Sequence, residues 1–231
     1  AAREAGVTVV NSPLATSVSV AELTLGLMLS VMRDIPRADA TMKAGKWLKK
    51  EFEGGELFKK TLGVIGFGRI GVAVADRAKA FDMEVLGYDP LIPADEIQKR
   101  GGIPVTFDEL LAKSDVITMH IPLTAESRGM LNADAFAKMK DGVRIVNAAR
   151  GGVIDEEALL QALESGKVAA AGLDVFMAEP PGLTPLVSHP RVICTPHIGA
   201  QTGEAQGRAA YDIATEVIAG LKGEPLRWKV A

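Results

Sequence analysis

The sequence predicts an α/β fold in which a doubly wound parallel sheet is covered by flanking interface helices. From Thr61 onward, short β-rich runs alternate with helical patterns, and a glycine-rich turn joins the first run to a helix. The runs are almost continuously apolar, which is typical of strands buried on both faces. Strands that alternate with helices require right-handed crossovers, and these place helices on both faces of the sheet.

The first 60 residues are predicted to form an N-terminal strand, an interface helix and a connector. Residues 7–10 are the expected strand, and a helix with Ser17 or Ser19 as its cap runs through residues 21–32. This helix and the segment around Trp47 are too apolar for a lone α/β unit. We therefore expect a subunit interface and a homodimer.

Residues 61–200 are predicted to form the α/β domain itself, and 201–231 a C-terminal helix and tail. The expected strands are 62–65, 84–88, 116–121, 143–147, 170–175 and 192–195. The expected helices are 70–81, 94–100, 108–113, 133–139, 156–165 and 203–221. Gly223 and Pro225 follow the last helix and would end it.

Composition excludes several classes of protein. The chain has 231 residues, 48% hydrophobic and 24% charged, and its net charge of -3 offers no basic surface for nucleic acid. The most apolar stretch, 23–32, is too short to cross a bilayer, so no membrane partner is expected. The single cysteine, Cys194, excludes an internal disulfide and a multi-cysteine zinc site. We expect no metal and, with no secretion signal at the start of the chain, a cytoplasmic location.

A G-x-G-x-x-G loop follows the first predicted strand and opens a helix. Its residues are Gly66, Phe67, Gly68, Arg69, Ile70 and Gly71. In this pattern Gly66 permits a tight turn, Gly68 admits a phosphate close to the backbone, and Gly71 lets the helix pack on the strand. Unpaired N–H groups at the helix N-terminus would face a pyrophosphate. The alternative is a plain glycine turn, but strand, spacing and helix together favour a dinucleotide-binding Rossmann unit.

Asp89 directly follows the second predicted strand, 18 residues after Gly71, where a ribose-binding carboxylate belongs in such a unit. It can accept hydrogen bonds from the adenosine ribose hydroxyls, and it would repel a 2′-phosphate. The sequence therefore predicts NAD rather than NADP as the cofactor. The alternative is that Asp89 merely begins a turn before Pro90.

Polar residues after the other strands are candidates for chemistry, because ligands bind outside the carboxyl ends of parallel strands. His120 is either a ligand contact or a loop histidine, and Pro122 stiffens its segment. Arg150 lies among small residues that would admit a ligand, where it can bind a carboxylate bidentately and polarise an adjacent carbonyl. The alternative for Arg150 is a surface ion pair with Asp155 or Glu156.

Glu179 follows the strand that ends near Asp174, and His197 follows the last predicted strand. If Glu179 meets His197, the carboxylate fixes the imidazole tautomer, and the histidine can give a proton to a carbonyl oxygen while a hydride reaches the carbon. His197 alone is as readily structural as catalytic. Glu179 and Arg150 are expected at the same rim of the sheet, and this grouping favours a catalytic role for His197 over a structural one. The third histidine, His189, lies in a polar loop and is expected to be structural.

Together these segments resemble the D-isomer-specific 2-hydroxyacid dehydrogenase family, most closely its phosphoglycerate dehydrogenase and hydroxypyruvate or glyoxylate reductase branches. The segments that carry the resemblance are 11–13, 20–24, 43–47, 62–71, 147–152, 174–180 and 196–200. The resemblance implies an NAD-dependent oxidoreductase that transfers hydride between NAD(H) and a short D-2-hydroxy or 2-keto acid. Candidates are 3-phosphoglycerate, hydroxypyruvate and glyoxylate.

The resemblance also implies residue roles. Arg150 would bind the substrate carboxylate and carbonyl, His197 would be the acid/base, and Glu179 its partner. Formate dehydrogenases, relatives in the same fold, usually have glutamine where this chain has Glu179, which favours a hydroxyacid substrate. The implied cofactor contacts are Gly66, Gly68, Arg69, Ile70, Gly71, Asp89, Ile121, Pro122, Ala148, Ala149, Arg150, Asp174, His197, Ile198, Gly199 and Ala200.

The chain departs from the family pattern in two places. Family members usually begin with a further lobe that holds the substrate carboxylate, so this chain looks truncated and its substrate site only half built. Residues 14–16 also lack the glycine-asparagine pair often found there. Turnover by this piece alone would be weak or absent. The alternative functions are an NAD-sensing interaction module, as in the C-terminal-binding corepressors that resemble this family, and a structural domain with a vestigial site.

Overall fold

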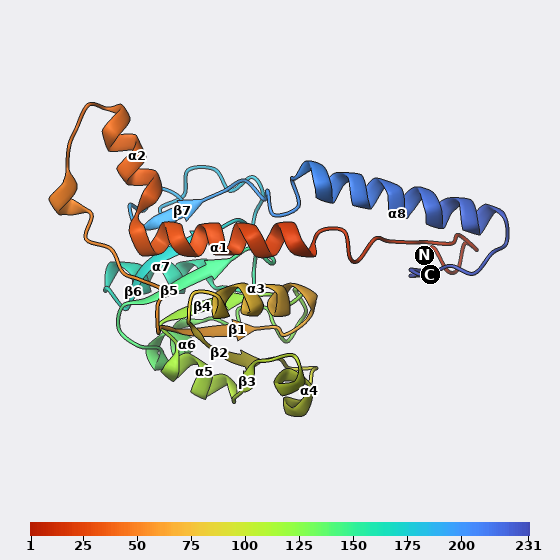
Figure 1. The fold of residues 1–231 in the computed structure, drawn as a ribbon, viewed down its shortest axis with the longest axis horizontal. Coiled ribbons are helices and arrows are strands. Elements are labelled where there is room, and N and C mark those ends of the chain that lie inside the picture. The colour runs from red at the N-terminus through yellow and green to blue at the C-terminus, as the bar shows by residue number, and fades with distance from the viewer.

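The computed structural model describes residues 1–231, and a seven-stranded sheet forms its centre (Figure 1). The strands are β1 (Thr61–Ile65), β2 (Glu84–Tyr88), β3 (Ile103–Pro104), β4 (Val116–Met119), β5 (Val143–Asn147), β6 (Val168–Leu173) and β7 (Val192–Cys194). Their order is β3-β2-β1-β4-β5-β6-β7, and every neighbouring pair is parallel. The predicted doubly wound α/β fold is confirmed. Of its strands, the short β3 was not predicted.

Strand order reverses between β1 and β4. β1 pairs with β2 on one side and with β4 on the other. The chain runs from β1 out to β2 and β3 and then crosses back to β4 on the far side of β1, so a crevice opens between β1 and β4 at the carboxyl edge. β4 ends two residues before its predicted end, so His120 and Ile121 lie just beyond the strand, at this crevice.

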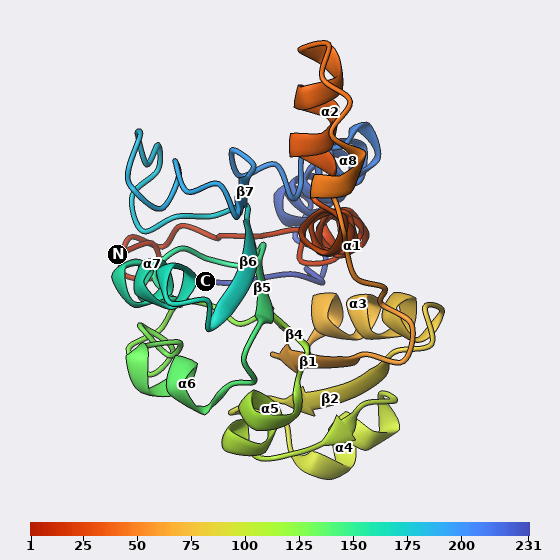
Figure 2. The same ribbon diagram turned by 90° about the vertical axis from the view of Figure 1, so that its left-hand side faces the viewer.

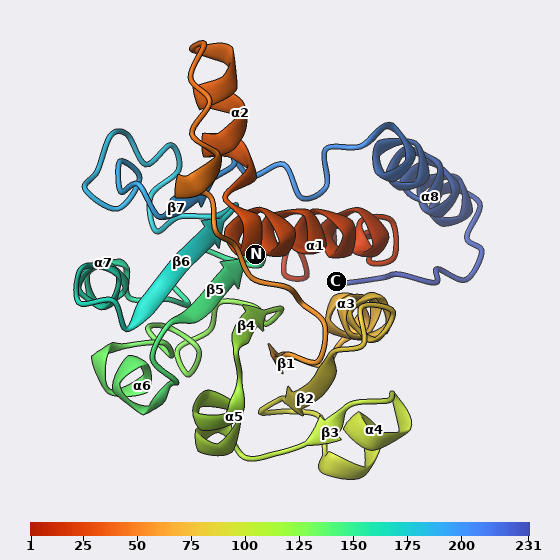
Figure 3. The ribbon, with the colours of Figure 1, turned by 60° about the vertical axis from the view of Figure 1, so that its left-hand side comes forward.

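Helices cover both faces of the sheet. They are α1 (Ser17–Arg33), α2 (Ile35–Lys43), α3 (Arg69–Lys79), α4 (Ala94–Lys99), α5 (Phe107–Lys113), α6 (Ala133–Lys138), α7 (Glu156–Glu164) and α8 (Gly203–Leu221), with a 3-10 turn, η1, at Lys49–Glu51. Figure 3 shows α1 and α3 on one side of the sheet and α5, α6 and α7 on the other. Each side encloses its own apolar core, of 18 and 23 buried residues respectively.

Helix α1 corrects two expectations. It packs against β5, β6 and β7, and side chains such as Ala21 and Met28 are fully buried within this chain, so most of the helix is not an exposed interface. Ser17 and Ser19 lie inside the helix, which follows Thr16, so neither is the predicted cap. Its end was better predicted: Asp34 adopts a left-handed conformation (φ 53°), and α2 begins there with Pro36 in its first turn.

Helix α8 and the two chain termini extend together beyond the end of the sheet (Figure 1). Arg208 on α8 donates two hydrogen bonds to the backbone oxygen of Ala15, which ties the helix to the segment before α1. Residues 7–10 do not form the predicted strand, because only a single bridge, Val10 to Lys229, pairs them with another segment. None of the helices combines the length and apolar character that a bilayer span requires.

Candidate active site at the carboxyl edge of the sheet

A cavity of about 350 Å³ lies at the carboxyl ends of β4, β5 and β6 and beside the start of α3. Its lining contains most of the residues predicted for the site: Ile70, Ile121, Pro122, Ala148, Ala149, Arg150, Asp174, His197, Gly199 and Ala200. His120, for which the sequence left two alternatives open, lines it too. Thr16 and Val20 line it as well, and sequence reasoning missed both. Both lie in segments that the family resemblance marks, 14–16 and 20–24, but no residue type in either segment points to a ligand by itself.

The three glycines of the loop differ in what surrounds them. Gly66 has a φ of 95°, and a Cβ there would lie 2.7 Å from the carbonyl of His120. A Cβ on Gly71 would lie 2.0 Å from the backbone oxygen of Gly66, so only glycine lets α3 pack this closely on the loop. A Cβ on Gly68 would meet nothing within 4 Å, because this position faces open space. The space beside Gly68 is where the sequence pattern places a phosphate.

The start of α3 has free donors. The backbone N–H groups of Arg69, Ile70 and Gly71 bond to no acceptor, and no side chain caps the helix. A helix N-terminus with unpaired N–H groups carries a partial positive charge and binds anions.

Asp89 both caps a turn and contacts the loop. Its Oδ1 accepts hydrogen bonds from the N–H groups of Leu91 (2.8 Å) and Ile92 (3.1 Å). Asp89 therefore does begin a turn before α4, as the alternative interpretation expected. Its Oδ2 accepts from the N–H of Phe67 at 2.8 Å, which places the carboxylate directly beside the glycine loop. Asp89 lies outside the lining of the cavity, as a contact to the distant adenosine ribose would.

Arg150 is exposed in a turn that Asn147 organises. Asn147 accepts from the N–H of Ala149 and donates to the backbone oxygen of Arg150, both at 3.0 Å. The alternative ion pair is wrong: Arg150 pairs with neither acid, since Asp155 caps α7 and Glu156 accepts from a backbone N–H. Asn147 is a further positioning residue, and its sequence signal is an amide that ends a buried strand just before small residues.

Asp174 organises the loop that carries His197. The side chain is fully buried, and its carboxylate accepts hydrogen bonds from the hydroxyl of Thr195 (2.6 Å) and the N–H groups of Ile198 (2.8 Å) and Gly199 (2.9 Å). Three donors leave one lone-pair position of the carboxylate for a ligand. Ile198 therefore contributes its backbone to this network, and its side chain is partly exposed.

Glu179 and His197 form a pair at the mouth of the cavity. Nδ1 of His197 lies 2.6 Å from Oε2 of Glu179, and Oε1 of Glu179 accepts from the N–H of Phe176 at 3.1 Å. Partial burial acts to raise the pKa of Glu179, but these two hydrogen bonds and the charges of His197 and Arg150 lower it below its ordinary value. The carboxylate is thus held ionised against the imidazole, and Arg150 lies close enough to act on the same carboxylate.

His120 presents an unsatisfied nitrogen at the cavity wall. Nε2 lies 3.1 Å from the hydroxyl of Thr118, while Nδ1 is buried and has no hydrogen-bond partner. Burial lowers the pKa of His120 to about 3, so the ring is neutral at physiological pH. A buried polar atom without a partner is costly, and a bound ligand would satisfy it.

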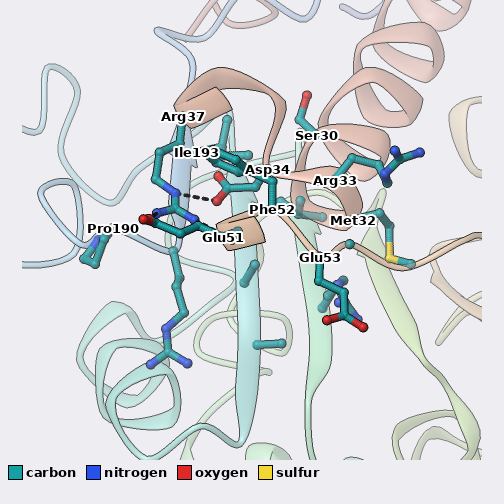
Figure 4. Close-up of a pocket in the computed structure, with 16 residues that line it drawn as sticks. Ser30, Met32, Arg33, Asp34, Arg37, Glu51, Phe52, Glu53, Pro190 and Ile193 are labelled. Carbon is teal, nitrogen blue, oxygen red and sulfur yellow. Dashed lines mark hydrogen bonds and ion pairs between the residues drawn. The ribbon is translucent and has the colours of Figure 1, made fainter. Parts of the chain in front are cut away.

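A second cavity, of about 240 Å³, lies at the opposite end of the sheet, where α1 meets α2 (Figure 4). Arg37 bonds to Asp34 there and stacks over the ring of Phe52. None of the predicted site residues lines this cavity, so it is separate from the candidate active site.

The residues at the carboxyl edge fit a dinucleotide. The free N–H groups of α3 and the open space at Gly68 suit a pyrophosphate, and Nδ1 of His120 lacks a partner that a ligand would provide. A parallel sheet with this loop at its switch point defines a Rossmann dinucleotide-binding domain. Residues 25–199 match the family described as D-isomer specific 2-hydroxyacid dehydrogenase, NAD binding domain. The chain belongs to this family, and NAD is the cofactor that the family domain binds.

Relatives in this family are similar over almost the whole chain. The D-3-phosphoglycerate dehydrogenase of Bacillus subtilis is 48% identical over 96% of this chain, which spans 42% of that protein. A glyoxylate reductase from Paecilomyes thermophila superposes with a TM-score of 0.92 at 40% identity, covering 99% of this chain and 70% of that one. The D-lactate dehydrogenase of Aquifex aeolicus, complexed with NAD and lactic acid, superposes with a TM-score of 0.85 at 35% identity, covering 96% and 72%. This chain thus spans about two fifths of the curated relative.

Proposed function

We propose that this chain is the cofactor-binding and catalytic part of an NAD-dependent dehydrogenase. It would transfer hydride between NAD(H) and a short D-2-hydroxy or 2-keto acid, with 3-phosphoglycerate as the first candidate and hydroxypyruvate or glyoxylate next. The observation that carries the proposal is the Glu179–His197 pair at 2.6 Å, at the mouth of a cavity that Arg150 also lines. The names of similar proteins support the substrate class.

Each residue has a role that follows from its surroundings. Glu179 holds Nδ1 of His197, which leaves Nε2 to exchange a proton with the substrate oxygen. Arg150 forms no ion pair within hydrogen-bond distance in the chain, and the one hydrogen bond of its guanidinium runs from Nη1 to the backbone oxygen of Ala149 (2.6 Å). The remaining N–H groups could bind the substrate carboxylate. When bound, NAD supplies the hydride chemistry.

The remaining predicted residues would hold the cofactor. The N–H groups of Arg69, Ile70 and Gly71 would bind the pyrophosphate and Asp89 the ribose, while Asp174 keeps the loop of His197 in place. Ile121, Pro122, Ala148, Ala149 and Ala200 form walls of the cavity. Glu179 and His197 remain 37% and 48% exposed, so the pair needs a further lobe to exclude water during turnover.

Titration calorimetry with NAD, NADH and NADPH tests the cofactor assignment on this chain directly. A version that also carries the N-terminal lobe is then assayed with a panel of 2-hydroxy and 2-keto acids. Arg150→Ala and His197→Ala should abolish most turnover and leave NADH binding intact, and unchanged turnover would refute both roles. Binding of NADH to a two-lobe protein that turns over no acid would instead favour the interaction module. Absence of NADH binding would favour a vestigial site.

We also propose that the protein is a homodimer. The support comes from the segment around Trp47 and not from α1, which the sequence analysis also expected at the interface. Most of α1 is buried in its own chain, but the arm formed by α2 and η1 projects from the body of the molecule (Figure 2). On this arm Trp47 is 76% exposed and Met42 53% exposed, which is costly for an isolated protomer. The cytoplasmic location suggested by the single cysteine stays a prediction.

A further inference from the structure

Phe67, the second residue of the glycine loop, is fixed by residues that lie outside the motif. Its ring is fully buried between β2 and the turn after α4. A Cβ on Gly102 would lie 2.4 Å from the ring, and one on Gly87 would lie 2.8 Å from it. Both positions therefore need glycine to admit the ring, and the turn after α4 is packed directly beneath the loop.

Both polar groups of Phe67 also have charged partners. Its N–H donates to Asp89 at 2.8 Å, and its carbonyl oxygen accepts from Nη1 of Arg100 at 2.9 Å. Nε of Arg100 bonds in turn to Glu96, one turn earlier on α4, at 2.8 Å. Arg100 is thus aimed at the loop by its own helix.

The carbonyl that Arg100 holds belongs to the same peptide unit as the N–H of Gly68. In a planar trans peptide these two groups point in opposite directions. Holding the carbonyl toward α4 therefore turns the N–H of Gly68 away from α4, and that N–H has no acceptor in the protein. A charge-assisted bond to the carbonyl also polarises the peptide and makes its N–H a stronger donor.

We propose that Arg100 is a positioning residue for the cofactor: it orients and polarises the Phe67–Gly68 peptide so that the loop binds the NAD pyrophosphate. The inference rests on the proposed placement of the pyrophosphate at this loop. Arg100 contacts no reacting atom, so it governs the affinity for NAD(H) and the KM for cofactor, and kcat at saturating cofactor is independent of it.

Lys99 provides a matched control for Arg100. It is the neighbouring residue and makes an ion pair with Asp95 at 3.1 Å and a longer one with Glu96 at 4.0 Å. It does not contact the loop. Arg100→Gln and Lys99→Gln therefore remove the same charge from the same helix, but only the first frees the carbonyl of Phe67.

NADH titration by calorimetry and thermal unfolding without cofactor are measured for both variants and for Arg100→Lys. We expect Arg100→Gln to weaken NADH binding about five- to tenfold, as loss of one partly exposed charge-assisted bond implies. Its unfolding temperature should match that of Lys99→Gln, which should bind NADH like the unsubstituted protein. Arg100→Lys should restore part of the affinity, because an ammonium keeps the charge and a donor.

Three results would overturn the inference. Equal NADH affinity of Arg100→Gln and the unsubstituted protein would show that the loop needs no such anchor. A drop in unfolding temperature specific to Arg100→Gln, with affinity lost only in proportion to the unfolded fraction, would leave Arg100 a merely structural role. Failure of the unsubstituted protein to bind NADH would refute the proposed function and this inference with it.

Discussion

Nδ1 of His197 lies 2.6 Å from Oε2 of Glu179, and this contact fixes which imidazole nitrogen remains free for chemistry. Glu179→Gln keeps the size of the side chain and removes its charge, so the imidazole loses its preferred tautomer. In the two-lobe protein we expect kcat to fall about 100-fold with NADH affinity unchanged. Steady-state kinetics and NADH calorimetry measure the two quantities. Glu164→Gln, an exposed change on α7, is the control.

The Glu179–His197 pair also predicts that the free energy of unfolding depends on pH in the acid range. The pKa of Glu179 is lower in the folded protein than in the unfolded chain, so its contribution to stability is complete above the unfolded value and is lost as the pH falls through the folded value. Acid unfolding of Glu179→Gln should therefore be less steep than that of the unsubstituted protein. Parallel acid-unfolding curves would contradict this.

His120 should also weaken the fold in acid, by the opposite mechanism. Its folded pKa of about 3 lies below the ordinary histidine value of 6.5, so below pH 6.5 only the unfolded chain takes up the proton. His120→Asn removes this difference. Between pH 6 and pH 5 the unsubstituted protein should lose up to about 1.4 kcal/mol more stability than the variant. Urea unfolding at the two pH values tests this, and an identical loss in both proteins would argue against a buried neutral ring.

Two glycines of one loop should respond differently to alanine. Gly71→Ala places a methyl group 2.0 Å from a backbone oxygen and should cost about 1–3 kcal/mol of unfolding free energy. Gly68→Ala meets no protein atom and should leave the unfolding temperature unchanged, while its methyl group fills the phosphate position and weakens NADH binding about tenfold or more. A stable Gly68→Ala variant with normal NADH affinity would contradict the phosphate assignment.

Trp47→Ser tests the proposed dimer. If the arm is the interface, sedimentation at micromolar concentration should show a dimer for the unsubstituted protein and a shift toward monomer for the variant. Phe58→Ser, at another large exposed side chain outside the arm, is the control. A monomer in every case, or a dimer that Trp47→Ser leaves intact, would refute this interface.

The fold was predictable where burial dictates sequence. The central strands are apolar on both faces, and five helices of the α/β region lie within two residues of their predicted bounds. Strand β3 was not predicted because it has only two residues, Ile103–Pro104, which is too short to show the alternation of apolar and polar residues that marks a strand. The role of α1 was misjudged for a physical reason: a helix apolar on most faces shows that it is buried, and nothing local shows whether its own sheet or a partner buries it.

The candidate site was predictable to a similar depth. Glycine spacing and polar residues at strand ends pointed to the residues that line the cavity. The sequence could not reveal contacts made across the fold, such as the hydrogen bond of Arg100 to Phe67. Arg100 sits at the end of a short surface helix, where an arginine is ordinary, and only the three-dimensional structure brings it under the loop.

Segments from opposite ends of this unit lie side by side, since the N–H of Val9 donates to the backbone oxygen of Ala231 at 3.0 Å. A domain whose two ends are adjacent can be inserted into a surface loop of another protein without separating the residues that flank the insertion. Such a domain also tolerates circular permutation, in which a short linker joins the two ends and new termini open in a surface loop. The spatial order of the strands in the sheet is unchanged. A circular permutant opened at Gly182 should therefore keep the NADH affinity of the parent chain.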